Sequence, residues 1–326
     1  MFNYIFRRLL QIIPIVLGIT FLSFTIMYFA GGNAVEILLE NQGLAVSQEV
    51  LNQKIHELGL DRPFFVQYFG WLIGFFSGDL GRSYVSGNDV FAVFTSKLPA
   101  TIILTLISLL LTLVISIPLG IYSALKHNKL ADYIIRAATF IGNSLPNFFV
   151  ALLLIFIFAI SLGWLPAISS KIGSSGLSSL SLKGALLPSF TLAIAMSSKY
   201  IRQIRALILD ELSKDYISGA KARGIPKASI LIKDVLKNSW LMIITLLALS
   251  AGDLLGGTAI IETIFQWDGV GKLAVDAIEM RDYPIIQMYV VWMALIYLFI
   301  NLITDLSYVF IDPRVKLNMG RDDERA

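Results

Sequence analysis

The chain has 326 residues, of which 56% are hydrophobic and only 15% are charged, and its formal net charge is +3. Soluble domains carry roughly 25% charged residues, so this composition excludes a disordered chain and indicates an integral membrane protein. The chain contains no cysteine, which excludes a disulfide-stabilised scaffold and Cys-ligated metal or iron–sulfur centres. The small net charge gives no reason to expect a nucleic-acid partner.

Stretches without Asp, Glu, Lys or Arg predict the membrane spans. Four contain at least 22 residues, enough to cross a hydrocarbon core of about 30 Å: 9–35, 98–125, 137–170 and 283–304. Two stretches of 15 residues complete the set: 184–198 and 238–252, the second followed by Asp253 and then apolar or small residues. Arg7 and Arg8 resemble the basic start of a signal peptide, but the apolar run that follows is too long for one. We therefore predict an all-α, polytopic membrane protein with six transmembrane helices.

The distribution of basic residues predicts the orientation of these spans. Segment 31–97 has four basic and seven acidic residues and segment 262–282 has two and five, so both are expected outside. The turn 126–136 has three basic residues and one acidic residue, and segment 199–237 has nine and four, so both are expected in the cytoplasm. Six spans then place both termini in the cytoplasm of a multi-pass protein of the cell membrane.

Segment 199–237 is the least apolar part of the core. Hydrophobic residues at helical spacing extend the fourth span to Leu212. Ser213 and Asp215 are expected N-caps of a short helix, and Gly224 is its expected C′ residue, with Pro226 preventing continuation. A second helix, Ser229 to Asn238, would lead into the fifth span. On composition alone, the segment also fits a basic loop that touches anionic lipid.

The spacing within this segment has a specific resemblance. Residues 215–224, with Asn238 fourteen positions beyond, resemble the EAA loop of ABC-importer permeases. In that family the loop forms the coupling helix, which docks into a groove on the ATP-binding subunit. The resemblance implies an ATPase-coupling role for eight residues: Asp215, Tyr216, Gly219, Ala220, Ala222, Arg223, Gly224 and Asn238. The small residues would allow close backbone approach, although Gly219 and Met242 depart from the residues usual in the family.

The resemblance to B-type permeases of peptide and nickel importers covers almost the whole chain. It rests on these motifs in order: Phe6-Arg7-Arg8-Leu9-Leu10, Leu58 to Pro63, Gly78 to Ser83, Leu98 to Thr101, Ser144 to Phe148, Trp164-Leu165-Pro166, Gly256 to Gly271, Arg281 to Pro284, and Asp312-Pro313-Arg314. The resemblance implies the type I ABC-importer architecture, with ATP and Mg on partner subunits and no cofactor on this chain. It also implies four kinds of partner: a second homologous permease, two ATP-binding subunits, an extracytoplasmic substrate-binding protein and membrane lipid.

The substrate is expected to be nickel, because the residues of these motifs most resemble those of the nickel-import permease B subunit. Asp253 also supports nickel, since dipeptide permeases tend to have an apolar residue at this position. A carboxylate within a span is by default a functional candidate, and one on the path would lower the barrier to a divalent cation. Asp253, Gly256 and Gly257 are therefore the candidate translocation path, with Asp253 as a transient metal ligand. A structural Asp253, close helix packing at the glycines, and di- or oligopeptides as substrate are the alternatives.

The chain divides into three predicted parts. Residues 1–97 form the first helix and an external segment, 98–312 a five-helix core containing the coupling loop, and 313–326 a cytoplasmic tail. Aromatic residues of the external segment fit either an interfacial helix or a docking platform for the binding protein. An enzyme is not expected: the sequence around Gly269 to Lys272 lacks the residues of a phosphate loop, and Asp253 has no acidic companion for intramembrane proteolysis. A passive channel would leave the small residues of segment 199–237 unexplained.

Overall fold

The computed structural model describes residues 2–29, 48–169 and 181–311. Within these residues every extended regular element is a helix, and the only strand-like feature is an isolated bridge between Arg82 and Asp89. The predicted all-α class is confirmed. The predicted tail 313–326, part of the external segment and Lys171 lie outside the described residues. The chain forms two compact units: unit 1 is 1–102, 168–181 and 258–298, and unit 2 is 103–167, 182–257 and 299–326.

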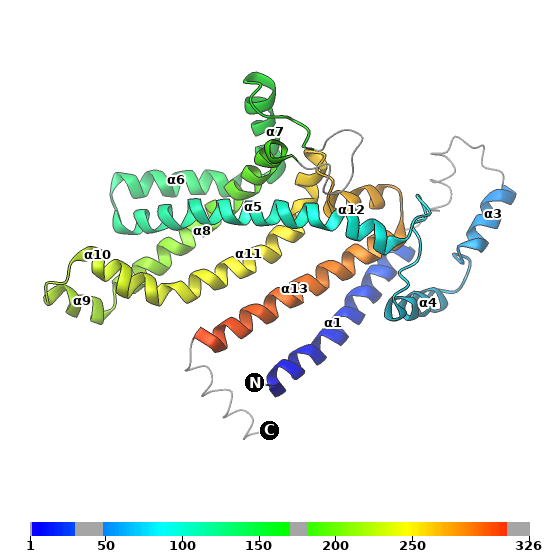
Figure 1. The fold of residues 1–326 in the computed structure, drawn as a ribbon, viewed down its shortest axis with the longest axis horizontal. Helices are drawn as coiled ribbons and strands as arrows, with labels where there is room; N and C mark the ends of the chain where they lie inside the picture. The colour runs from blue at the N-terminus through cyan, green and yellow to red at the C-terminus, as the bar shows by residue number, and fades with distance from the viewer. Residues whose placement is uncertain (1, 30–47, 170–180, 312–326) are drawn as a thin grey trace. The chain divides into compact units, whose positions relative to one another are not determined.

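Among the described residues, unit 1 contains four helices and the ends of three that it shares with unit 2 (Figure 1). Its helices are α1 (Phe2–Phe29), α3 (Gln48–Glu57), α4 (Phe64–Ser77) and α12 (Val270–Glu279). The shared helices are α5 (Val90–Leu125), α11 (Lys237–Ile264) and α13 (Tyr283–Ile311). The 36 residues of α5 make it about 54 Å long at 1.5 Å per residue.

Aromatic side chains join α4 to α1. Tyr68 is buried, its ring lies 5.4 Å from that of Phe21 and 5.5 Å from that of Phe24, and its hydroxyl lies 3.3 Å from that of Thr20. The helix ends at Gly78, whose φ of +83° is in the left-handed region that favours glycine. Other rings of α4 remain exposed: Phe65, Phe69 and Phe76. The expected aromatic helix of the external segment is therefore present, and both of its functional interpretations stay open.

The start of α12 is held by two polar side chains from neighbouring helices. The Thr101 hydroxyl donates to the Glu262 carboxylate at 2.7 Å and accepts the backbone N–H of Val270 at 2.9 Å. The same carboxylate accepts the N–H of Lys272 at 2.9 Å. A carboxylate at a helix N-terminus satisfies N–H groups that have no partner within the helix and interacts favourably with the helix dipole. Glu262 and Thr101 thus explain why α12 begins where it does.

Unit 2 contains the remaining helices. They are α6 (Leu130–Ser144), α7 (Asn147–Leu154), the π-helical segment η1 (Ile155–Ser161), α8 (Leu182–Leu212), α9 (Asp215–Ala222), α10 (Lys227–Ser229) and the π-helical segment η3 (Ile230–Leu236). Helices α6 and α7 pack on α8 (Figure 1), and the Ser123 hydroxyl near the end of α5 donates to Asp132 near the start of α6. Gly120 of α5 allows a close approach to α8, because an added Cβ would lie 2.8 Å from Ile204 Cγ2.

Three described segments are long and apolar enough to cross a membrane: Leu10–Phe29, Val90–Leu125 and Tyr283–Ile303. Helix α6 and the helix formed by α7 and η1 qualify only as a pair, bent by 102°. The sequence predicted one uninterrupted span over 137–170, and the structure differs because Pro146 disfavours helical geometry at Leu145, whose ψ is 131°. The two shorter predicted spans, 184–198 and 238–252, lie within the longer helices α8 and α11.

Candidate functional site

The arm, defined as residues 213–236, connects α8 to α11 at one end of unit 2 (Figure 1). Its first helix, α9, was expected to be capped by Ser213 or Asp215, and that expectation is wrong. Lys214 occupies the N-cap position without a side-chain cap, and the Ser213 hydroxyl instead donates to the Asp210 carbonyl at 2.7 Å. Ser213 is therefore used by the last turn of α8, and Asp215 stands in the first turn of α9, where its negative charge suits the helix dipole.

The end of α9 confirms the prediction that Gly224 is its C′ residue. Gly224 has a φ of +74°, and its N–H donates to the Lys221 carbonyl at 3.0 Å. The N–H of Ile225 donates to the Ala220 carbonyl at 3.3 Å, which completes a Schellman motif with Gly224 at C′. The following helix begins earlier than predicted, after Pro226, and α10, η3 and α11 follow one another without an interruption. The predicted helix from Ser229 to Asn238 therefore leads into the predicted fifth span without a break, and Asn238 lies in the first turn of α11.

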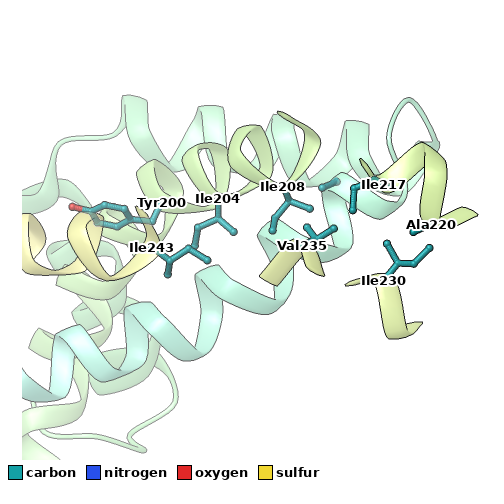
Figure 2. Close-up of a cluster of buried hydrophobic side chains, with 9 residues drawn as sticks. Tyr200, Ile204, Ile208, Ile217, Ala220, Ile230, Val235 and Ile243 are labelled. Carbon is teal, nitrogen blue, oxygen red and sulfur yellow. The ribbon is translucent and has the colours of Figure 1, made fainter. Parts of the chain in front are cut away.

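One side of α9 is covered by the chain's own hydrophobic core (Figure 2). Ile217 and Ala220 of α9 are buried, at 0% and 3% exposure, in a cluster whose other buried members come from α5, α8, η3 and α11. The other labelled members of this core are Tyr200, Ile204, Ile208, Ile230, Val235 and Ile243. Full burial of one isoleucine side chain stabilises by roughly 1.5–3 kcal/mol. The small side chain of Ala220 therefore serves packing within this chain.

The opposite side of α9 is open. Its exposed residues carry both charges: Asp215, Tyr216, Ser218, Lys221, Ala222 and Arg223. A Cβ added to Gly219 would meet no atom within 4 Å apart from the adjoining backbone of its own helix. All of the predicted coupling residues are exposed except Ala220, which is buried, and Gly219, which is partly buried. Because residues 219 and 222 are small, another protein can approach the backbone of α9 closely on this side.

A polar cluster next to α9 contains two predicted residues, Tyr216 and Asn238, and two that the sequence analysis missed, Glu211 and Lys214. The Tyr216 hydroxyl donates to the Glu211 carboxylate, and Asn238 Nδ2 lies 2.9 Å from that hydroxyl and 3.3 Å from the carboxylate. Lys214 Nζ lies 2.5 Å from the same carboxylate. Burial raises the pKa of Glu211, but hydrogen bonds from Lys214, Tyr216 and Asn238 outweigh it, so the pKa is lowered. The signal for Glu211 was its place on the apolar stripe of α8, three residues after Ile208.

The candidate path residues lie in the second half of α11. The backbone of Asp253, Gly256 and Gly257 is helical, and their side chains lie outside the described part of the structure. Among the described residues, no group of three or more His, Cys, Asp or Glu side chains is arranged to hold a metal ion. The role of these three residues stays a prediction.

Residues 116–317 match the family model "Binding-protein-dependent transport system inner membrane component", and residues 1–105 match the model of the N-terminal part of such membrane components. The chain belongs to this family of ABC-importer permeases. The permease is an inner membrane component that works with a second permease, ATP-binding subunits and a substrate-binding protein.

Relatives of the permease match over nearly its full length. It is 38% identical to the oligopeptide transport system permease protein AppB of Bacillus subtilis, over 96% of this chain and 99% of that one. It is 34% identical to the dipeptide permease DppB of Alkalihalophilus pseudofirmus (97% and 100% coverage) and 33% identical to the glutathione permease GsiC of Escherichia coli O6:H1 (97% and 99%). These names give no support to the predicted nickel subtype and favour the peptide alternative.

The fold of the permease is also that of a solved transporter. A chain of the MetNI methionine ABC transporter, in an inward-facing conformation, matches with a TM-score of 0.56 over 68% of the permease and 97% of that chain. The two sequences are only 14% identical, so the likeness concerns the fold.

Proposed function

We propose that the permease transmits ATP hydrolysis by its partner subunits to a peptide path, with α9 as the coupling helix. The observation that carries this proposal is the two-sided environment of α9: Ile217 and Ala220 anchor it to the core of unit 2, while its other side is open. A helix held on one side and free on the other suits docking into a groove of another protein. In this proposal the arm and both termini are cytoplasmic, and the ATP-binding subunits hold ATP and Mg.

The proposed substrate class is di- or oligopeptides, including peptides such as glutathione. Support comes from relatives with 33–38% identity that are named for oligopeptide, dipeptide and glutathione transport. Nickel, the substrate expected from the acidic residue at position 253, becomes the second candidate. Asp253, Gly256 and Gly257 remain the proposed lining of the path, since an ionisable residue within a span usually faces an aqueous route or another helix.

The docking role is tested by replacing Gly219 with Trp. Because a Cβ at this position would meet no atom within 4 Å apart from the adjoining backbone of its own helix, the permease should fold and insert normally. We expect the ATP-binding subunits to be lost when the variant is purified from membranes. The matched control is Ala228→Trp, an equally bulky change at an exposed residue of α10. Retention of the ATP-binding subunits by Gly219→Trp would contradict the docking of α9.

The substrate is tested by uptake in cells that lack this chain and are complemented with it. Labelled dipeptide, labelled glutathione and radioactive nickel are supplied separately. We expect restored uptake of a peptide and no change in nickel uptake. Restored uptake of nickel alone would reverse the order of the two candidates.

A further inference from the structure

Glu211 is a buried carboxylate that meets three other parts of the chain. It lies in the last turn of α8 with 6% of its surface exposed. Its oxygens accept hydrogen bonds from Lys214 between the helices, from Tyr216 in α9 and from Asn238 in α11. Because Asn238 also donates to the Tyr216 hydroxyl, Glu211, Tyr216 and Asn238 form a closed triangle that joins α8, α9 and α11.

A carboxylate in this position needs its partners. Burying an ionised group is costly unless it is paired and hydrogen-bonded, so Glu211 stabilises the arrangement that supplies all of its donors. Lys214 contributes charge but is 49% exposed, and pairs exposed to this extent contribute little to stability. The constraint on α9 therefore comes mainly from the hydrogen bonds of Tyr216 and Asn238.

The hydrophobic core alone does not hold α9 in one orientation. Contacts of Ile217 and Ala220 with the core are non-directional, and they remain favourable when the helix rotates slightly about its axis. Hydrogen bonds weaken steeply with angle, so the triangle of Glu211, Tyr216 and Asn238 resists that rotation. The triangle also ties α9 simultaneously to the helix before it and to the helix after it.

We propose that Glu211 is a positioning residue that locks α9 to α8 and α11, so that a displacement of α9 moves both helices together. The inference rests on the proposed coupling role of α9 and adds the residue that makes the connection rigid. Glu211 lies outside the segment 215–224 on which the resemblance to the coupling loop rests. Its role follows from the contacts described above.

The experiment uses the complete transporter in lipid nanodiscs and proteoliposomes. Because the permease contains no cysteine, Arg202→Cys and Lys221→Cys, at exposed residues of α8 and α9, introduce two labelling sites in this chain. With cysteine-free partner subunits, the distance distribution between the two spin labels is measured. We expect Glu211→Ala to broaden this distribution. We also expect the ratio of substrate imported to ATP hydrolysed to fall roughly fivefold, the factor that corresponds to the loss of one hydrogen bond of about 1 kcal/mol.

Three further variants separate positioning from general destabilisation. Glu211→Gln keeps an oxygen that accepts from Tyr216 and Asn238, so it should restore most of the narrow distribution and of the ratio. Tyr216→Phe removes one hydroxyl and should reproduce the broadening even if Glu211→Ala folds poorly. Asp210→Ala removes the neighbouring exposed carboxylate and should change neither quantity.

The outcomes distinguish this inference from the function on which it rests. An unchanged distance distribution in both Glu211→Ala and Tyr216→Phe overturns the positioning role. A broadened distribution with an unchanged ratio of import to hydrolysis supports Glu211 as the residue that positions α9, and instead overturns coupling through α9. Broadening together with a reduced ratio, both restored in Glu211→Gln, supports the two proposals.

Discussion

Arg205 of α8 holds Asp132 of α6 with two hydrogen bonds, from Nε at 2.7 Å and from Nη2 at 2.8 Å. Asp132 is fully buried, and its carboxylate also accepts the Ser123 hydroxyl at 2.6 Å and the Asn128 N–H at 3.0 Å. The carboxylate therefore joins the end of α5, the start of α6 and α8. This junction lies on α8 six residues before Glu211, so it supports the helix from which the arm begins.

Removing the cation of this pair should strongly destabilise unit 2. We predict that Arg205→Ala lowers the free energy of unfolding by roughly 3–5 kcal/mol, because it leaves the buried charge of Asp132 without its main partner. The thermal midpoint of the purified permease measures this change. Lys54→Ala is the control: Lys54 and Glu57 are both about half exposed, and such a pair contributes about 0–1 kcal/mol. Equal shifts in the two variants would refute the structural role of the pair.

The carboxylate of Asp132 should make the thermal stability of the permease depend on pH under acidic conditions. The hydrogen bond from Arg205 holds the pKa of Asp132 well below its usual range. A group whose pKa is lowered in the folded state stabilises fully above its unfolded pKa, about 3.9, and this stabilisation is lost as pH falls through the folded pKa. We predict a thermal midpoint that falls below about pH 4. The fall should be shallower in Asp132→Asn, and an identical slope in both proteins would contradict this origin.

The turn after α9 should require glycine. At a φ of +74°, Gly224→Ala introduces strain of roughly 1–2 kcal/mol, although no atom blocks the new Cβ. Gly219→Ala is the matched control, since the same change inside a helix stabilises by up to about 1 kcal/mol. Hydrogen exchange of α9 amides should be faster in Gly224→Ala and not faster in Gly219→Ala. The opposite order would contradict the Schellman turn.

The hydroxyl of Thr101 should stabilise the N-terminal end of α12. Thr101→Val removes the donor to Glu262 and the acceptor of the Val270 N–H, and we predict a loss of roughly 1–3 kcal/mol. Limited trypsin cleavage after Lys272, in the first turn of α12, should become faster. Thr101→Ser retains the hydroxyl and should resemble the unaltered protein. Unchanged cleavage in Thr101→Val would show that α12 is held by other contacts.

Asp253→Asn should reduce the rate of peptide uptake more than it reduces the amount of assembled transporter. The substitution removes a charge from α11 while keeping the size of the side chain, so subunit association is expected to persist. Initial uptake rates in proteoliposomes, divided by the amount of assembled transporter, measure the effect. Asp210→Asn makes the same change of charge at an exposed residue outside the predicted spans and should leave uptake unaltered. If both variants transport normally, Asp253 does not line the path.

The parts of the candidate site that the sequence predicted are those governed by local chemistry. Gly224 occupies the C′ position because few residues other than glycine adopt a positive φ at low cost. Helix α8 extends to Leu212 because its buried residues repeat at helical spacing. The prediction of Ser213 or Asp215 as the N-cap of α9 was wrong, because the Ser213 hydroxyl donates to the Asp210 carbonyl in the last turn of α8 instead.

The sequence by itself determined that the permease is a helical membrane protein and that a short helix is followed by a turn at Gly224, and its motifs indicated the ABC-importer permeases. These properties depend on hydrophobic runs, on spacing and on the backbone freedom of one residue. Only the tertiary structure decided that Glu211 becomes buried beneath α9 and that Arg205 meets Asp132, which lies 73 positions earlier. Both depend on how separate helices pack, because a charged side chain becomes buried only where another part of the chain supplies its partners.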